Sequence, residues 1–352
     1  MEITLKDKIS YINSFKDEVS LMEVCGTHTV AISKFGIRNI LSKNINLISG
    51  PGCPVCVTPN IYLDYIYDLS LKENVIIVTY GDMIRVPGSK PSITLEKAKA
   101  KGAKVRIVYS SIDALEIAKK NNDKKVVFLG IGFETTTPAS AVLIKEAARQ
   151  NIKNIYILSL HKLVEPVMRA ILEDKTMHID GFLCPGHVAL VTGEKGFDFL
   201  EEYDCTGVIA GFELEEIVEA LYQLLINIKS ENNILSNCYK KLIKREGNKY
   251  SQELIKEVFD IKDDYWRGLG LVPNSGYRIK SIYKAYDIEE LFPINFKEAN
   301  KANGCECGEV LKGKIKPNEC KLFKVSCNPE NPIGPCMVSS EGSCATYYKY
   351  SI

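Results

Sequence analysis

The sequence predicts an α/β protein with two similar doubly wound lobes, each built on a parallel sheet, and a C-terminal loop-rich domain. Three observations predict this architecture. Between residue 19 and about residue 230, short runs that are apolar throughout alternate with amphipathic stretches, which is typical of parallel βαβ units. The number of these runs exceeds what one small lobe needs. After Gly268 the alternation stops, and Gly, Pro and six cysteines gather instead.

The strands and helices follow from hydrophobic periodicity. The runs expected to be strands are 19–24, 45–49, 75–80, 104–108, 125–132, 154–159, 179–184 and 206–210. Helical spacing is clear in residues 60–73 and 137–150, and residues 1–19 form a polar amphipathic helix. Residues 231 to 262 are also expected to be helical and charged.

The domain boundaries rest on the number of strands. Eight strands in about 190 residues fit two small lobes better than one. The polar run "KKNNDKK" (119–125) is the expected seam. This places lobe I at 1–122, lobe II at 123–230, and a helical connection with the cysteine-rich domain at 231–352. Exchange of chain between the lobes is the alternative.

Composition limits the function classes. The chain of 352 residues is 45% hydrophobic, and its net charge of +1 comes from 45 basic and 44 acidic residues. Because no long basic run occurs, we expect no nucleic-acid partner. The longest apolar runs are strand-sized, so we expect no membrane partner, and the N-terminus lacks the apolar core of a signal peptide. We therefore expect a cytoplasmic protein, whose thiols stay reduced.

Twelve cysteines in a reducing compartment indicate metal or redox chemistry. Cys184 and Cys205 lie in or beside apolar strands, and Cys238 lies in an expected helix. For Cys205 and Cys238 the favoured interpretation is a buried small hydrophobe. The other nine cysteines need a chemical role.

Six of these nine lie in the tail, residues 305 to 344. Thiolates suit zinc or an iron–sulfur cluster, and structural disulfides are a third interpretation. Zinc sites usually take closely spaced pairs, whereas only Cys305 and Cys307 are close in sequence here. We expect four ligands of a [4Fe-4S] cluster and a reactive pair, Cys307 and Cys336, although spacing does not decide between Cys305 and Cys307. The expected ligands are Cys305, Cys320, Cys327 and Cys344.

Reactive side chains also follow the expected strands, where ligands bind in open α/β sheets. "CGTHT" brings Cys25 and His28, and "GPGCPVC" brings Cys53 and Cys56 as a dithiol switch, half a zinc site or iron ligands. Any single one of these side chains could instead cap a helix, form an ion pair or sit in the core. The remaining strand-end candidates are Asp82, Arg85, Glu134, Thr135, His161 and His187.

Cys25 leads directly from a strand into a helix. Amide groups at the start of a helix can stabilise a thiolate. Such a thiolate is a soft ligand for ferrous iron or a nucleophile toward an electrophilic carbon. His28 would then be a base or a second metal contact. An inert buried cysteine is the alternative.

Taken together, the motifs resemble the HypD family of hydrogenase maturation proteins. The resemblance runs from about residue 20 to the C-terminus, with all motifs in order. It is carried by "MEVCGTHT", "GPGCPVC", "TYGDMIRVPG", "GFETTTP", "CPGHV", "NSGYR" and the tail from "CECGEVL" to "PIGPCMVSSEGSCA".

The resemblance implies a scaffold that acts with the small partner HypC. The pair would hold iron while two cyanides and one carbon monoxide are attached, and would pass Fe(CN)2CO toward the [NiFe]-hydrogenase large subunit. Cyanide would arrive from HypE, which carries it as a thiocyanate made with HypF. Such a protein is a metallocofactor assembly scaffold with redox chemistry rather than a conventional turnover enzyme.

The resemblance also implies residue roles. Cys25 would bind iron, Fe(II), with His28 beside it, and Cys53 and Cys56 would be a redox dithiol facing the same cleft. The tail would hold a [4Fe-4S] cluster, with Cys307 and Cys336 passing electrons onward, because cyanide release needs two electrons and a cluster supplies them singly. Candidates for proton delivery or partner contacts are Glu134, His187 and Glu341.

Two other function classes remain open on the sequence. The first is an iron–sulfur-dependent disulfide reductase acting on a protein partner, which would need every thiol except Cys25. The second is an α/β binding protein with a zinc-capped tail.

Overall fold

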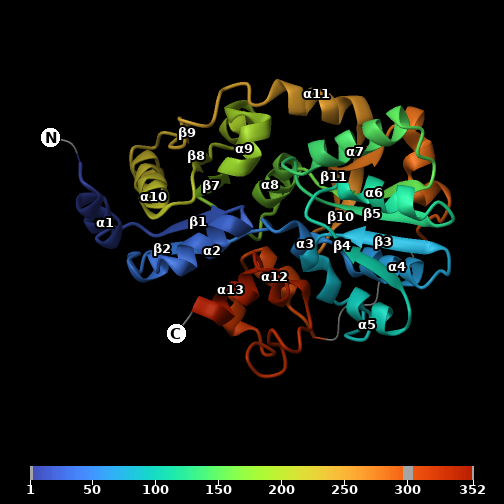
Figure 1. Ribbon diagram of the computed structural model, residues 1–352. Helices are drawn as coiled ribbons and strands as arrows, with labels where there is room; N and C mark the ends of the chain where they lie inside the picture. The colour runs from blue at the N-terminus through green and yellow to red at the C-terminus, as the bar shows by residue number, and fades with distance from the viewer. Residues whose placement is uncertain (1–2, 296–303, 351–352) are drawn as a thin grey trace.

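The computed structural model describes residues 3–295 and 304–350 of the chain. Two parallel sheets form two lobes that lie side by side, and the C-terminal segment packs below the junction between them (Figure 1). Lobe I is defined here by the sheet that contains β1, and lobe II by the sheet that contains β3. The predicted fold class, two doubly wound parallel lobes with a cysteine-rich C-terminal region, is confirmed.

Lobe I has five parallel strands in the spatial order β2-β1-β7-β8-β9. Its interior strands β7 and β8 are buried at every position, because helices cover both faces of the sheet. The strands are β1 (Val19–Glu23), β2 (Ile45–Ser49), β7 (Gly181–Pro185), β8 (Thr206–Ala210) and β9 (Leu235–Asn237).

Lobe II has four parallel strands in the order β4-β3-β5-β6. Its strands are β3 (Val75–Thr79), β4 (Lys104–Ile107), β5 (Lys125–Gly132) and β6 (Ile155–His161). An antiparallel hairpin packs onto β6 and is made of β10 (Phe259–Trp266) and β11 (Gly270–Ile279).

Helices connect the strands and cover the sheets. Helix α10 packs on β7 and β8, and α11 packs on both α7 and α9 above the two lobes (Figure 1). The α-helices are α1 (Leu5–Asn13), α2 (Gly26–Lys34), α3 (Pro54–Val57), α4 (Asn60–Ser70), α5 (Leu95–Ala100), α6 (Asp113–Lys120), α7 (Thr137–Arg149), α8 (Val164–Glu173), α9 (Gly186–Thr192), α10 (Leu214–Lys229), α11 (Lys249–Val258), α12 (Cys307–Leu311) and α13 (Ser343–Tyr350). Short 3-10 helices are η1 (Ile37–Asn39), η2 (Gly81–Arg85), η3 (Glu194–Tyr203), η4 (Ser281–Tyr286), η5 (Ile288–Glu290), η6 (Pro317–Glu319) and η7 (Pro335–Met337).

All eight predicted strands are present, and their ends differ from the prediction by at most two residues. Helix α1 is shorter than predicted, and residues 1–2 of the expected N-terminal helix lie outside the described residues. Among the described residues, no helix is long and apolar enough to cross a bilayer.

The sheets divide the chain differently from the predicted boundary at residue 122. Strands β7 to β9 join β1 and β2 in lobe I, whereas β3 to β6 form lobe II. The polar run 119–125 connects α6 to β5 inside lobe II. An apolar run predicts a strand but not its neighbours, and parallel pairing through long crossovers lets the chain leave a sheet and return to it.

Residues 231 to 262 are not the predicted continuous helix. They form β9, a loop that begins with Cys238, helix α11 and the first part of β10. The hairpin escaped prediction because polarity does not follow burial in β10: Asp264 is buried, whereas Ile261 and Tyr265 are exposed. Pro273 and Gly276 in β11 also look like loop residues.

Candidate metal and redox site

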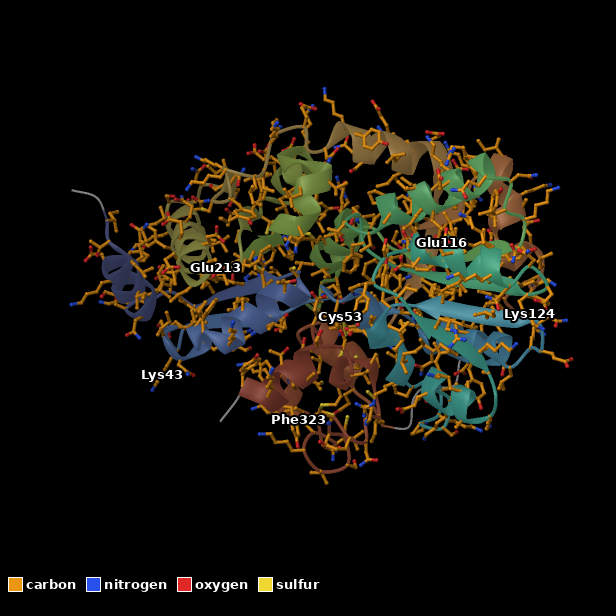
Figure 2. The ribbon with its side chains drawn as sticks, viewed as in Figure 1. Lys43, Cys53, Glu116, Lys124, Glu213 and Phe323 are labelled. Carbon is orange, nitrogen blue, oxygen red and sulfur yellow. A yellow bond between two sulfur atoms is a disulfide. The ribbon has the colours of Figure 1, made fainter. Side chains whose placement is uncertain are left out.

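A cavity of about 260 Å³ lies where the two lobes and the tail meet. The carboxyl ends of strands from both sheets open into it, as expected for open α/β sheets. Residues from all three parts of the molecule line it, among them Cys25, Pro54, Asp82, Thr135, His187 and Glu341. Figure 2 shows the labelled Cys53 at the same junction.

Cys25 lies two residues after the end of β1 and directly precedes helix α2, in extended conformation. Burial raises the pKa of its thiol to about 12, and the nearby backbone amides of His28 and Thr27 act in the opposite direction without forming a cap hydrogen bond to the sulfur. The predicted helix-start amides are therefore present. Because burial disfavours a free thiolate, a cation bound at the sulfur is what would hold Cys25 deprotonated.

Glu23 is a buried carboxyl group that the sequence analysis missed. It accepts a hydrogen bond from the backbone N–H of Cys25 at 3.3 Å and one from the hydroxyl of Thr29 at 2.6 Å. Burial raises its pKa to about 7. The available signal was the charged residue itself, which interrupts an apolar strand run directly before Cys25.

His28 does not line the cavity. Its Nε2–H donates to the carbonyl of Gly211 at 2.9 Å, and its ring stacks with Phe212 at 4.6 Å between centroids. Burial lowers its pKa to about 4, so the ring is neutral near pH 7. Its Nδ1 is buried without a hydrogen-bond partner among the described residues.

His187 does line the cavity and stacks with the same Phe212 ring at 4.1 Å. Burial lowers its pKa. A largely neutral imidazole in a cavity wall can accept or donate a proton. This position is consistent with the predicted role in proton delivery.

Cys53 and Cys56 form a disulfide, with their Cα atoms 5.2 Å apart. Cys53 is the N-cap residue of the short helix α3, and Cys56 lies within this helix, close to Cys25. The carbonyl of Gly52 accepts a hydrogen bond from the N–H of Gly26 at 3.0 Å, and a Cβ atom at Gly52 would lie 2.3 Å from the nitrogen of Cys25. Glycine before the CxxC pair therefore allows the two thiol-bearing loops to touch.

The tail brings all six of its cysteines to one cavity, which Val310, Leu322 and Phe323 also line. The thiol of Cys307 interacts with those of Cys305 and Cys336, which lowers the pKa of Cys307 and raises the pKa values of the other two. The two predicted reactive thiols, Cys307 and Cys336, are 4% and 1% exposed and both line the same cavity.

This thiol cavity fits the chemistry of an iron–sulfur cluster. Apolar walls surround the sulfurs, and the N–H of Ile333 donates to the sulfur of Cys327 at 3.4 Å, a type of contact that tunes bound clusters. A Cβ atom at Gly334 would lie 2.4 Å from the sulfur of Cys305, so glycine leaves that thiol room. Within the described residues no three His, Cys, Asp or Glu side chains form a single-ion site; a [4Fe-4S] cluster takes four separate thiolates.

The tail is fastened to both lobes beside the interlobe cavity. Glu341 accepts a hydrogen bond from the hydroxyl of Thr27 in lobe I at 2.9 Å, and Ser339 donates to Asp82 in lobe II at 3.0 Å. Arg85 donates to the carbonyl of Pro329 at 2.6 Å. Burial raises the pKa of Glu341. The loop "SSEGSC" thus bridges the lobes.

Other candidates lie away from this cavity. Glu134 is buried and accepts from the N–H of Val164 at 2.9 Å, and burial raises its pKa to about 7. His161 is a core histidine whose nitrogens contact Ser140 and Ser159. Cys205 is buried, as expected, and Cys184 is buried too, whereas Cys238, expected to be a buried residue in a helix, is half-buried in a loop.

Thiols from three segments gather near the lobe junction. Cys25 and the CxxC pair come from lobe I and its connection to lobe II, and the other six come from the tail. The elements that carry Cys307 and Cys336, α12 and η7, both pack on α3 with its CxxC pair. These four cysteines belong to one hydrophobic core. The fold and site define a class of protein: a two-lobed α/β protein with a cysteine-rich tail. The tail elements that carry thiols pack against the helix that carries the CxxC pair.

Comparison with known proteins identifies the particular family. Residues 2–351 match the model of the HypD family, described as "Hydrogenase formation hypA family". The chain is 43% identical over 337 residues to the hydrogenase maturation factor HypD2 of Bradyrhizobium diazoefficiens, covering 94% of this chain and 88% of the relative. It is 39% identical over 349 residues to the hydrogenase maturation factor HypD of Escherichia coli, covering 98% and 93%. The chain belongs to the HypD family of hydrogenase maturation factors, as the sequence motifs indicated.

Proposed function

We propose that this protein, together with a HypC partner, is the scaffold on which the Fe(CN)2CO unit of [NiFe]-hydrogenases is assembled. The iron is the cargo, and Cys25 is its thiolate ligand, with His28 behind it. HypE, loaded by HypF, would deliver cyanide, and the hydrogenase large subunit would receive the product indirectly. The observation that carries this proposal is that the tail elements with Cys307 and Cys336 pack on the CxxC helix, and that the loop before this helix packs on Cys25.

In the tail, Cys305, Cys320, Cys327 and Cys344 would hold the [4Fe-4S] cluster, leaving Cys307 and Cys336 as a dithiol. When bound, the cluster supplies electrons one at a time. A thiolate of the Cys307/Cys336 pair attacks one sulfur of the Cys53–Cys56 disulfide, and the other sulfur leaves as a thiolate. The second tail thiolate then attacks the mixed disulfide. Two electrons pass to Cys53 and Cys56, the tail pair becomes a disulfide, and two protons follow.

The buried surroundings suit this chemistry. The apolar tail cavity keeps the thiols of Cys307 and Cys336 away from water, and the interlobe cavity places Cys25, His187 and Glu341 around the same space. His187 and Glu341 would hold or move protons while cyanide is released. Glu134, which lies outside the cavity lining, would act through the position of α8.

Anaerobic copurification with HypC, followed by iron quantitation and infrared spectroscopy, tests the scaffold. The wild-type complex should carry iron with cyanide and carbon monoxide stretches. The Cys25→Ala variant should lose these bands and keep the tail cluster, because only the cargo site has lost its thiolate. Cys238→Ala, which removes a half-buried thiol far from both cavities, should behave as wild type. Cyanide bands that persist in Cys25→Ala would exclude the assigned iron ligand.

The alternative is a disulfide reductase that uses the cluster and the CxxC pair on a protein substrate. It would need no thiol at Cys25 and would show no such bands in the wild-type complex. The same spectra therefore separate the two functions.

A further inference from the structure

The turn of the β10–β11 hairpin, residues 266–270, touches both the CxxC helix and the tail helix that carries Cys307. We propose that this turn is a wedge that fixes the position of the CxxC helix relative to the tail thiols, with Arg267 as its positioning residue. This role of the wedge depends on the proposed function, in which Cys307 and Cys336 pass electrons to Cys53 and Cys56.

On one side the wedge binds the end of α3. The backbone N–H of Arg267 donates to the carbonyl of Val57 at 2.7 Å, and its Nε donates to the carbonyl of Cys56 at 3.0 Å. The two terminal nitrogens reach the side chain of Asn60 at 2.6 Å and the carbonyl of Thr58 at 2.5 Å. A cation at the carboxyl end of a helix satisfies carbonyls that lack helical partners. One residue thus holds three consecutive carbonyls of the CxxC helix.

On the other side the backbone of the wedge lies directly against the backbone of α12. A Cβ atom at Gly268 would lie 2.5 Å from the Cα of Gly308, and one at Gly308 would lie 2.8 Å from the Cα of Gly268. Gly308 directly follows Cys307. Gly268 also has a φ of +82°, which L side chains rarely adopt. The close approach and the positive φ both require glycine at position 268. The hairpin turn therefore packs tightly against α12, the helix that carries Cys307.

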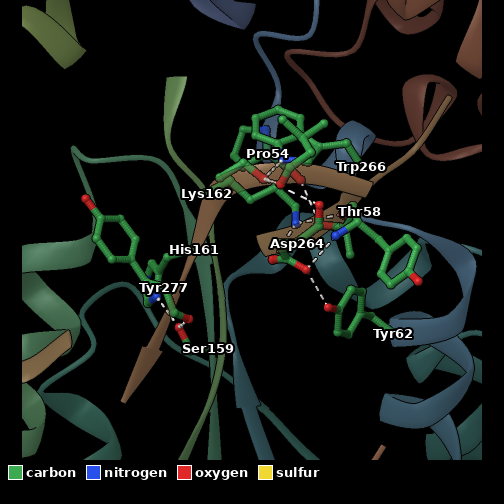
Figure 3. Close-up of polar contacts among 12 residues, drawn as sticks. Pro54, Thr58, Tyr62, Ser159, His161, Lys162, Asp264, Trp266 and Tyr277 are labelled. Atoms are coloured by element: carbon green, nitrogen blue, oxygen red, sulfur yellow. Dashed lines mark hydrogen bonds and ion pairs between the residues drawn. The ribbon is translucent and has the colours of Figure 1, made fainter. Parts of the chain in front are cut away.

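Buried polar contacts with lobe II hold the strand β10 that leads into the wedge. Lys162 and Asp264 form a fully buried ion pair at 2.8 Å, and Tyr62 donates to the other Asp264 oxygen at 2.5 Å. Figure 3 shows this network, with Trp266 beside Lys162 and with Thr58 of the CxxC connection nearby. Trp266 donates to Ser275 at 2.8 Å. A satisfied buried network of this kind is rigid, so the turn keeps its position.

The remaining contact leads to the interlobe cavity. The ring of Trp266 stacks with Phe133 at 6.0 Å between centroids, and Phe133 lines that cavity. The wedge therefore contacts the tail helix, the CxxC helix and the wall of the cavity in which Cys25 lies.

Thiol–disulfide exchange needs two sulfurs held in line and in contact, so loosening α3 should slow it. Cluster-loaded protein with Cys53–Cys56 oxidised is reduced anaerobically, quenched by alkylation at set times and analysed by mass spectrometry. Arg267→Gln should slow the opening of Cys53–Cys56 at least tenfold, and Arg267→Lys should recover part of the rate. The visible spectrum of the cluster should stay unchanged.

Arg169→Gln is the matched control. Arg169 is also half-buried and hydrogen-bonded through its guanidinium, but to Glu165 and Glu202, which lie on α8 and η3 and not on the CxxC helix. This variant should open Cys53–Cys56 at the wild-type rate. Equal slowing in Arg169→Gln and Arg267→Gln would overturn the proposal, because it would show a general loss of stability.

Hydrogen exchange of the same variants separates the wedge from the electron transfer. In Arg267→Gln the amides of residues 53–60 should exchange at least tenfold faster than in wild type, with the cluster present or absent. Unchanged exchange in this segment overturns the wedge. Faster exchange in the variant, combined with no cluster-dependent opening in wild type, supports the wedge and rejects the proposed function instead.

Discussion

Burial controls the chemistry of single residues around the interlobe cavity. The thiol of Cys25 and the carboxyl groups of Glu23 and Glu134 all have pKa values raised by desolvation, whereas His28 is held neutral by it. The thiol of Cys25 and the ring of His28 are thus uncharged near pH 7, and the two carboxyl groups are about half protonated there, as expected where water is excluded. For Cys25 this means that binding of a metal cation and loss of the proton are coupled.

Glu134 gives a pH-dependent prediction. Its pKa is raised from 4.5 to about 7 in the folded protein, so between these values the folded state binds a proton that the unfolded state has lost. Stability should therefore fall as pH rises from about 4.5 to 7, and stay level above. One pH unit is worth about 1.4 kcal/mol, so the fall reaches roughly 3 kcal/mol.

Urea unfolding of Glu134→Gln across this range checks the sign and the size. The stability of wild type minus that of the variant should decline with pH by this amount. Glu253→Gln, an exposed position on α11, should track wild type throughout. A pH-independent difference between wild type and Glu134→Gln would refute the assigned ionisation.

Short elements bring together cysteines that lie far apart in the chain. Helix α3 has only four residues, and its position depends on glycine before it, on the hairpin turn beside it and on α12 and η7 below it. Such elements have little stability of their own. Their placement is therefore a property of the surrounding packing.

Gly52→Ala tests how closely the CxxC loop must approach Cys25. The added methyl group would meet the backbone of Cys25, at 2.3 Å from its nitrogen and 2.5 Å from its Cα, and neither atom can move freely. Overpacking of this kind costs roughly 1–3 kcal/mol or more. We expect a lower free energy of unfolding and weaker iron retention in the HypC complex.

Gly81→Ala is the control for this substitution. Gly81 follows β3, the next strand along the chain. Its added methyl group would meet only a side-chain atom of Ile107, at an ordinary 3.9 Å. The cost should stay within about 0.5 kcal/mol. A Gly52→Ala variant as stable as Gly81→Ala would contradict the close approach.

At the scale of the whole molecule, the sequence predicted the elements better than their assembly. Apolar runs located all eight strands, and motifs after the strands located Cys25, the CxxC pair and His187. The runs could not show that β7 to β9 return to pair with β1, because buried parallel strands look alike. Glu23 and Arg267 escaped notice because their roles come from contacts with other elements. Glu23 contacts Thr29 on α2, and Arg267 contacts Cys56, which is distant in the chain.

The central claim is that the tail thiols pass electrons to the CxxC pair across a packed interface, and anaerobic reduction of the cluster-loaded protein tests it most directly. Alkylation and mass spectrometry then report whether Cys53–Cys56 has opened. We expect opening in wild type and in Cys238→Ser, and none in Cys307→Ser, in Cys336→Ser or in protein without the cluster. Opening at the wild-type rate in Cys307→Ser, or in protein that lacks the cluster, would contradict the account.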